Sequence, residues 1–192
     1  MSAHEPLVVH ESELRVRVLP LLRERVFHVT SRERLQSMYD DGFIRSNRDA
    51  SFGNTYPQSA VNVGRRNGFV CLFDLRSQTE EAVQHGLGCF YFLAPPPLGD
   101  DLAFLLLAPA VYSQLVLWDD IKLTVEIGAF HIPDLECWFP TDIPMSAIER
   151  VELVHVVRRP AEDPDPAVVA LAAAMRADLA RNAKRRGTRR CN

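Results

Sequence analysis

Short apolar runs separated by polar turns fill the first 160 residues of the chain. Their length, and their content of β-branched and aromatic residues, predict strands rather than long helices. The expected strands cover residues 26–31, 69–75, 87–93, 102–107, 135–139 and 147–154. The last two are joined by a turn at residues 141–144. This pattern predicts a sheet of several short strands.

Helical patterns are also short, and they lie between these strands. For residues 32–40, a hydroxyl at Thr30 or Ser31 can cap the first turn. Gly42 follows the last turn, where glycine commonly ends a helix. Further helical patterns cover residues 11–24, 77–84 and 167–182, the second with a capping box that begins at Ser77. Short helices and strands in this mixed order favour an α+β fold over a doubly wound one.

Residues 45–68 form the longest stretch without a periodic pattern. They are rich in Arg, Asn, Ser and Gly, and they predict a polar loop. A loop of this length inside a compact domain is more often functional or mobile than simply connecting. We therefore expect this loop to do more than join two strands.

The length of 192 residues, 47% of them hydrophobic, suits one well-buried core. We expect a lead-in at residues 1–25, one domain at residues 26–160, and a C-terminal helix with a basic tail at residues 161–192. Residues 1–6 lack the pattern of a signal peptide, and the longest apolar run, residues 102–111, is broken by Pro109. Four cysteines without a CxxC pair predict reduced thiols and no metal. These features predict a cytoplasmic protein that does not enter a membrane.

Positive charge is concentrated at the end of the chain. Six bases lie in residues 181–190, whereas the whole chain has a net charge of −3. Without these six, 16 bases face 25 acids, so the remainder carries −9. A basic tail on an acidic body can bind phosphates in a salt-dependent way. The competing interpretation is a frayed, solvated end that keeps the protein soluble.

Several common catalytic signatures are missing from the sequence. It contains no GxGxxG, GxxxxGK[ST], HExxH or GxSxG motif. The chain therefore lacks the signatures of doubly wound dinucleotide-binding folds, P-loop enzymes, zincins and common hydrolases. Any activity must come from a sparser set of residues.

Two segments of the chain carry a pattern seen in one known superfamily. The first runs Phe27-His28-Val29-Thr30-Ser31, then a helix, then Asp41-Gly42-Phe43-Ile44. The second runs Leu135-Glu136-Cys137-Trp138-Phe139 and continues with Asp142-Ile143-Pro144 and Ile148. An aromatic-His-x-Thr/Ser strand end with a Gly-Ile close, and a glutamate strand followed by Ile-Pro, resemble the ADP-ribosyltransferase superfamily. The closest resemblance is to its DarT-like, DNA-modifying members, and it covers about residues 26–44 and 135–154.

The resemblance implies a mixed, mostly antiparallel split sheet and transfer of ADP-ribose from NAD+. The transition state of that transfer is an oxocarbenium-like sugar, which a preorganised carboxylate stabilises. By resemblance, Glu136 supplies this carboxylate and holds a ribose hydroxyl. His28 contacts another ribose hydroxyl, and Thr30 contacts the nicotinamide amide. NAD+ is then the substrate, and no metal takes part.

Cationic side chains of the 45–68 loop are the candidates for the pyrophosphate or the incoming acceptor. By their order along the chain, Arg65 and Arg66 are best placed for this role, with Arg45 and Arg48 behind them. The competing interpretation of Arg65 and Arg66 is a solvated pair of loop residues. The sequence leaves this choice open.

The chain departs from the superfamily pattern in three respects, the first being a middle region shorter than that of DarT-like enzymes. The tyrosine of its His-Tyr-Glu branch has no certain counterpart, and the candidates are Tyr56 in the loop, Tyr91 and Tyr112. Two residues before Glu136, where the superfamily often has Gln or Glu, this chain has Asp134, which is one methylene shorter than Glu. The acceptor is therefore left open.

Two functions from different classes fit these observations. In the first, the protein is a toxin-like ADP-ribosyltransferase that modifies a nucleic acid, such as single-stranded DNA, or a protein, with an antitoxin as a further partner. In the second, it is a non-catalytic module of the same fold that binds nucleic acid or protein. Removal of an RNA 2′-phosphate is a weaker third reading. His28 and Glu136 converging on one pocket supports the transferase, and their burial on separate faces contradicts it.

Overall fold

The computed structural model describes residues 5–49, 51–52, 61–89, 100–125 and 129–157. The chain divides into two compact units, Met1–Arg158 and Arg159–Asn192. The helix expected at residues 167–182 and the basic tail lie in the second unit, outside the described residues. In the part that is described, no helix is both long and apolar enough to cross a membrane.

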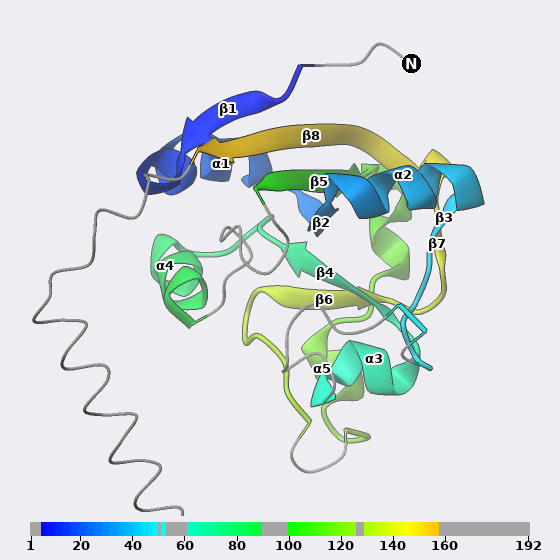
Figure 1. Cartoon of the computed structure of the whole chain (residues 1–192). Helices are drawn as coiled ribbons and strands as arrows, with labels where there is room; N and C mark the ends of the chain where they lie inside the picture. The colour runs from blue at the N-terminus through cyan, green and yellow to red at the C-terminus, as the bar shows by residue number, and fades with distance from the viewer. Residues whose placement is uncertain (1–4, 50, 53–60, 90–99, 126–128, 158–192) are drawn as a thin grey trace, which may run out of the picture. The chain divides into compact units, whose positions relative to one another are not determined.

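A six-stranded sheet forms the centre of the first unit (Figure 1), with the strand order β1-β8-β5-β2-β4-β6. The strands are β1 (Leu7–His10), β2 (Val26–Ser31), β4 (Val70–Asp74), β5 (Asp101–Leu107), β6 (Glu136–Phe139) and β8 (Ile148–Val157). Strands β1 and β8 pair in parallel, and the other pairs in this sheet are antiparallel. A second, two-stranded sheet joins β3 (Phe43–Ile44) to β7 (Ile143–Pro144). The fold is α+β, as the sequence predicts.

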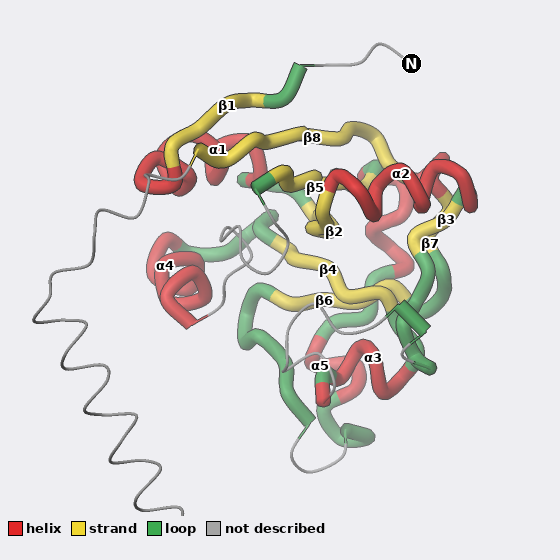
Figure 2. Tube along the Cα trace, in the orientation of Figure 1, coloured by secondary structure: helices red, strands yellow, loops and turns green. Residues whose placement is uncertain are grey.

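Short helices connect the strands (Figure 2). The α-helices are α1 (Leu14–Leu22), α2 (Arg32–Asp41), α3 (Val63–Asn67), α4 (Glu80–Cys89) and α5 (Trp118–Ile121). Single 3₁₀ segments cover Glu11–Glu13, Pro109–Gln114 and Met145–Ala147. These elements are too short to be stable alone, so packing on the sheet must hold them.

Two apolar cores lie on the two faces of the large sheet. One contains Phe27 and Phe104 from the strands, together with Leu22 of α1 and Val83 of α4. The other contains Leu72 and Leu105 from the strands, Leu35 of α2, and Tyr112 of the 3₁₀ segment packed against it. Alternate residues of each strand therefore enter different cores, as the period of two along a strand requires.

The first segment of the resemblance folds as its local signals predict. Strand β2 covers the expected residues, and the Ser31 hydroxyl accepts a hydrogen bond from the Arg34 N–H at 3.3 Å. Helix α2 ends at Gly42, whose φ of 76° is easily adopted by glycine. Ser31, rather than Thr30, is thus the cap of this helix.

The predicted strand at residues 87–93 is wrong at its start, because residues 87–89 continue helix α4. The rest of that prediction lies outside the described residues. The cap of α4 is also displaced from Ser77, since the Thr79 hydroxyl accepts from the Ala82 N–H at 3.1 Å. The backbone of Gly86 packs so tightly on Leu135 that a Cβ atom at position 86 would overlap it. Tertiary contact therefore favours helix where the apolar pattern was ambiguous.

The segment expected as a lead-in is part of the same fold. Strand β1 pairs with β8 from Leu7 opposite Val154 to His10 opposite Val157. Helix α1 also buries its apolar side chains in the first core. Residues 7–22 therefore contribute to the sheet and to its packing.

Candidate functional site

Glu136 is the first residue of β6, and its side chain is only 8% exposed. Its Oε1 atom accepts hydrogen bonds from Asn62 Nδ2 at 2.7 Å and from Trp138 Nε1 at 2.9 Å. Its Oε2 atom accepts from the backbone N–H of Ile132 at 2.8 Å. The carboxylate is thus held in one orientation by three N–H donors, none of which carries a charge.

A tight turn before β6 brings one of these donors into place. The Glu136 N–H donates to Ile132 O at 3.0 Å, and Asp134 has a φ of 62°. A positive φ is uncommon for a residue other than glycine, although Asp tolerates it better than most. The turn directs the Ile132 N–H back at the carboxylate. The side chain of Asp134 itself is exposed, two residues from Glu136.

Asn62 connects Glu136 to helix α3. Its Oδ1 atom accepts from Gly64 N at 2.7 Å and from Arg65 N at 3.4 Å, so it caps the helix. The thiol of Cys71 also lies 3.0 Å from that oxygen. The 45–68 loop therefore ends in a capped helix, although its polar composition predicted irregular structure.

Burial raises the pKa of Glu136 above its ordinary value, and the hydrogen bonds from Asn62, Ile132, Trp138 and Cys71 oppose this effect. Burial also raises the pKa of the Cys71 thiol well above its ordinary value, and the charge of Glu136 adds to the increase. Cys71 is therefore a neutral thiol at physiological pH. It is a hydrogen-bonding neighbour of the carboxylate and is unsuited to act as a thiolate nucleophile.

Aromatic rings lie beside the carboxylate. Trp138 is fully buried, and its ring centroid is 6.4 Å from that of His131. His131 in turn stacks on Trp118, with centroids 3.9 Å apart and the planes at 10°. Burial lowers the pKa of His131, which favours the neutral ring in this stack. The indole of Trp138 thus combines an apolar wall with a donor to Glu136.

His28 lies on β2, and its Nδ1 atom is 3.0 Å from the backbone oxygen of Cys71. Because a carbonyl oxygen only accepts, Nδ1 must carry the proton and donate it. Burial lowers the pKa of His28, so the ring is neutral at physiological pH. The remaining nitrogen, Nε2, is then left as the acceptor atom of the ring.

The register places His28 and Glu136 on opposite faces of the sheet. Phe27 is paired with Phe73, and Phe73 is paired with Glu136, so these three side chains share one face. His28 is the next residue along β2, and it is paired with Leu105 of the other core. The two side chains therefore do not point into one pocket, which counts against the transferase expectation; His28 is half-buried and Glu136 is buried. Cys71 lies between them, with its carbonyl toward His28 and its thiol near Glu136.

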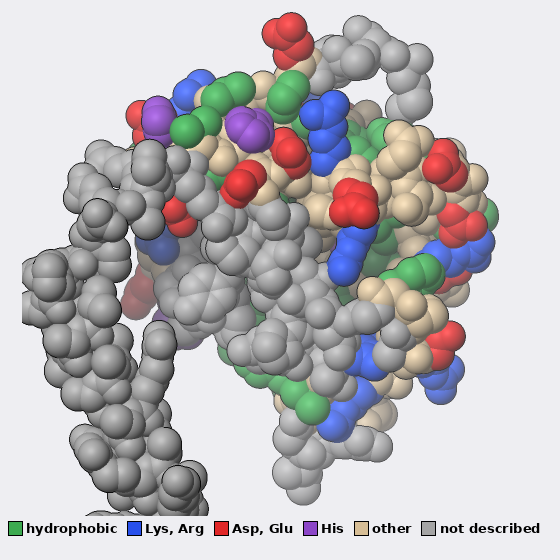
Figure 3. All heavy atoms as spheres, in the orientation of Figure 1, with side chains coloured by type: hydrophobic (Ala, Val, Ile, Leu, Met, Phe, Trp, Pro, Cys, Tyr) green, Lys and Arg blue, Asp and Glu red, His purple; other side chains and the backbone are tan. Residues whose placement is uncertain are grey.

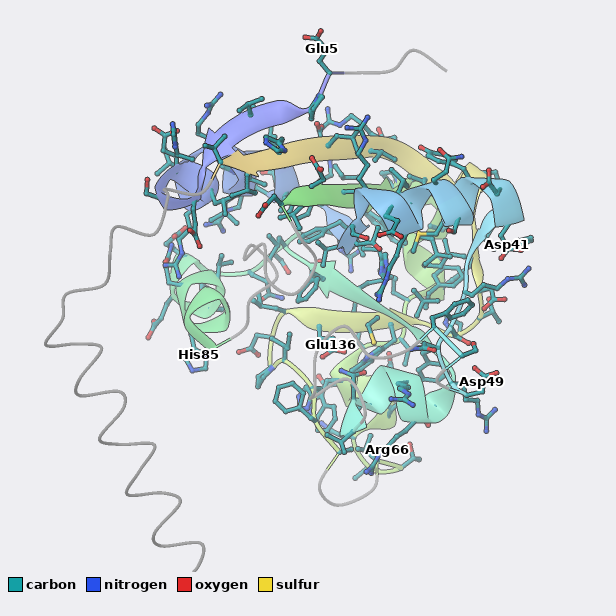
Figure 4. The ribbon with its side chains drawn as sticks, in the orientation of Figure 1. Glu5, Asp41, Asp49, Arg66, His85 and Glu136 are labelled. Carbon is teal, nitrogen blue, oxygen red and sulfur yellow. The ribbon has the colours of Figure 1, made fainter. Side chains whose placement is uncertain are left out.

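The other predicted site residues are dispersed. Thr30 is 3% exposed and lies on the His28 side of β2. Arg65 and Arg66 are both on α3, whose N-cap is Asn62, and Arg65 is half-buried whereas Arg66 is exposed. Figure 4 labels Arg66 on this helix. Tyr56 and Tyr91 lie outside the described residues.

Two of the remaining candidates have structural contacts. Arg45 donates to Asp41 Oδ2 at 2.5 Å and to Asp142 Oδ2 at 2.9 Å, which ties the end of α2 to the turn after β6. The hydroxyl of Tyr112 donates to the backbone oxygen of Leu107 at 3.2 Å. These contacts give Arg45 and Tyr112 roles in holding the fold.

The structure adds three residues to those expected from the sequence, namely Asn62, Cys71 and Trp138. Trp138 follows Glu136 by two residues on one strand, and that spacing could have indicated a shared face. Asn62 is 74 positions from Glu136, and only its N-cap role before Val63 leaves a local signal. Among the described residues, no group of three or more His, Cys, Asp and Glu side chains could hold a metal ion.

Comparison with known proteins identifies no relative of established function. No protein-family profile and no curated protein matches the sequence. A solved structure that matches is the X-ray crystal structure of protein CC0527 from Caulobacter crescentus, with a TM-score of 0.37 and 11% sequence identity. The match covers 67% of this chain and 83% of that one. A likeness this weak defines neither the fold nor the function, which must be argued from the residues.

Proposed function

We propose that this protein is an NAD+-dependent ADP-ribosyltransferase in which Glu136 is the acidic group at the reacting ribose. The supporting observation is the Glu136 carboxylate itself, which is buried and fixed by three N–H donors. A carboxylate that is already oriented stabilises developing positive charge without reorganisation. The proposal also rests on the resemblance of residues 26–44 and 135–154 to that superfamily.

In the proposed reaction the bond between nicotinamide and C1′ of the ribose breaks, and its electron pair leaves with neutral nicotinamide. The sugar gains oxocarbenium character, which the Glu136 carboxylate stabilises. In the described contacts, Oε2 of Glu136 accepts one N–H, that of Ile132. One of its lone pairs therefore remains for a ribose hydroxyl. The acceptor then bonds to C1′ and releases its proton to solvent.

His28 and the arginines of α3 have supporting roles in this proposal. The Nε2 atom of His28 accepts a hydrogen bond from a second ribose hydroxyl, and Thr30 faces the nicotinamide amide. Arg65 and Arg66 neutralise the pyrophosphate, for which a guanidinium is well suited. Because His28 and Glu136 lie on opposite faces of the sheet, NAD+ must then reach both faces. It would do so beyond the Phe27–Phe73 pair, where the pairing of β2 with β4 ends.

The proposed acceptor is a nucleic acid, with single-stranded DNA as the first candidate, or a protein. On the face seen in Figure 3, described Lys and Arg side chains alternate with Asp and Glu. That face offers no continuous basic strip in its described part. A toxin-like transferase of this kind acts in the cytoplasm and is matched by an antitoxin.

The decisive experiment measures nicotinamide release from NAD+ by the wild-type protein, Glu136→Gln and Glu11→Gln, with and without single-stranded DNA. Glu136→Gln keeps the shape and removes the charge, so we expect release to fall at least about 100-fold. Glu11→Gln removes an exposed carboxylate and should leave release unchanged. Stimulation by DNA would identify the acceptor class. Equal release by the wild type and Glu136→Gln would refute the role of Glu136.

A second candidate, a non-catalytic nucleic-acid- or protein-binding module of the same fold, is favoured by the opposite faces of His28 and Glu136. In that case Glu136 is a structural acceptor for Asn62 and Trp138. The folded wild-type protein would then release no nicotinamide and show no NAD+ binding by calorimetry. Titration with labelled single-stranded DNA would show whether the module retains a nucleic-acid partner.

A further inference from the structure

One side chain, that of Asn62, joins the two parts of the proposed site. Through Nδ2 it donates to Glu136 Oε1 at 2.7 Å. Through Oδ1 it accepts from the first turn of α3, at Gly64 N and Arg65 N, and from the Cys71 thiol. The carboxylate and the arginine-bearing helix are thus tied to opposite ends of a single amide.

The backbone around Asn62 leaves little freedom for that amide. The Val63 N–H donates to Phe130 O at 2.9 Å, and the Phe130 N–H donates to Val61 O at 2.9 Å. These two bonds fix residues 61–63 beside the turn that leads into Glu136. The amide therefore points at the carboxylate from a position that is fixed on both sides.

Gly64 keeps helix α3 close enough for this contact. A Cβ atom at position 64 would overlap the indole of Trp138 and would lie 2.6 Å from Cys71 Sγ. A glycine is needed at position 64 because the first turn of α3 lies directly on Trp138 and Cys71, which surround Glu136 together with Asn62. The close packing at Gly64 and the hydrogen bonds of the Asn62 amide thus both keep the first turn of α3 beside Glu136.

From these contacts we propose that Asn62 is the positioning residue of the site: its amide orients the Glu136 carboxylate and fixes the start of α3. The catalytic part of this inference rests on the proposed transferase function. The orientation of the carboxylate does not, and it can be tested without NAD+.

The chemistry of Asn62 makes the inference specific. Its N–H group favours the charged form of Glu136, as do the N–H groups of Ile132 and Trp138. Among the described residues, the titratable group that contacts this carboxylate is the Cys71 thiol, whereas Cys137, the next residue along β6, points to the other face of the sheet. Both thiols remain neutral at physiological pH because burial raises their pKa. Removing the Asn62 N–H therefore shifts the protonation equilibrium of Glu136, and no charged thiol opposes that shift.

Two variants separate the donor from the cap. Asn62→Asp keeps oxygens that can cap α3, removes the N–H donor and adds a negative charge beside Glu136. Asn62→Ser keeps a capping oxygen, removes the donor and adds no charge. Asn67→Asp is the matched control, because Asn67 lies on the same helix and donates to Val63 O at 2.9 Å rather than to Glu136. Thermal melting followed by circular dichroism verifies that each variant is folded.

The first measurement is the pKa of Glu136 by carbon-13 NMR of its labelled side-chain carboxyl group. We expect Asn62→Asp to raise this pKa by about one unit or more, and Asn62→Ser to raise it less. Asn67→Asp should leave it unchanged. Equal pKa values in the wild type and both folded Asn62 variants would overturn the inference, whether or not the protein consumes NAD+.

The second measurement is the pH profile of kcat for nicotinamide release. We expect the acid limb to move upward in Asn62→Asp by the same amount as the Glu136 pKa, with kcat reduced about 10- to 100-fold. An unmoved acid limb in an active Asn62→Asp protein would overturn the positioning role. If the wild type releases no nicotinamide, the transferase proposal fails, and the NMR titration alone decides whether Asn62 orients Glu136.

Discussion

Two carboxylates, one in each segment of the resemblance, occupy opposite kinds of environment. Glu136 is buried against neutral donors, and burial raises its pKa. Asp41 is exposed at the end of α2, and its hydrogen bond with Arg45 lowers its pKa. An exposed ion pair of this kind stabilises the fold only weakly, whereas a buried carboxylate makes every donor around it matter. The comparison indicates that Glu136 depends on the neutral donors around it, whereas Arg45 ties two segments together.

The largest effect should follow from removing the Glu136 acceptor. Glu136→Leu leaves three buried N–H groups, on Asn62, Ile132 and Trp138, without their partner. We expect the free energy of unfolding to fall by about 3 kcal/mol, with partial compensation because a buried carboxylate is no longer desolvated. Urea denaturation measures this change. Glu136→Gln, which keeps one acceptor oxygen, should lose clearly less, and an equal loss would mean that the charge of the carboxylate, rather than its acceptor oxygens, governs the cluster.

A smaller effect is expected from filling the space at Gly64. Gly64→Ala places a methyl group against Trp138 and Cys71, and overpacking of this kind costs about 2 kcal/mol. Gly42→Ala is an informative control, because position 42 has open space and a φ of 76°, so its cost of about 1 kcal/mol is conformational. The fluorescence of Trp138 should change in Gly64→Ala alone. An unchanged stability in Gly64→Ala would show that α3 can move away from β6.

The pH dependence of stability separates the two carboxylates by sign. Since the folded state raises the pKa of Glu136 above 4.5, its stabilising contribution is fully present below that pH and is lost as pH rises through the folded pKa. The loss is about 1.4 kcal/mol for each pKa unit. Asp41 has the opposite sign, because its contribution is present above 3.8 and is lost as pH falls.

Urea denaturation of the wild type and Glu136→Gln from about pH 4 to about pH 8 tests this sign. The wild type should lose stability relative to Glu136→Gln as pH rises. A constant difference between the two proteins would contradict the raised pKa of Glu136.

The smallest effect should come from the exposed cluster. Arg45→Gln removes the ion pairs to Asp41 and Asp142, and the pKa of Asp41 should then return toward 3.8. NMR titration of the aspartate carboxyls measures this return. The melting temperature should change little, and any change should diminish in high salt because exposed charges are screened. A large, salt-independent loss of stability would place Arg45 among the residues on which the fold depends.

Local signals in the sequence were sufficient for much of the sheet and for helix α2. Strand β2, the Ser31 cap, Gly42 and the β6 strand with Glu136 all depend on residues within a few positions of each other. The helix α3 carried similar signals, with Asn62 at its cap and Gly68 after its end, but the polar composition around it hid them. Local chemistry therefore determined these elements, but not residues 87–89, where tertiary contact favours helix.

Only the tertiary structure decided which side chains meet. The contact between Asn62 and Glu136 spans 74 positions, and it exists because residues 61–63 are bonded to Phe130 beside the turn before β6. The opposite faces of His28 and Glu136 likewise follow from the pairing register across β4, which no local pattern contains. Sequence alone determined a glutamate at the start of a strand and a histidine near the end of another. Long-range pairing and burial determined the partners, orientation and pKa of each.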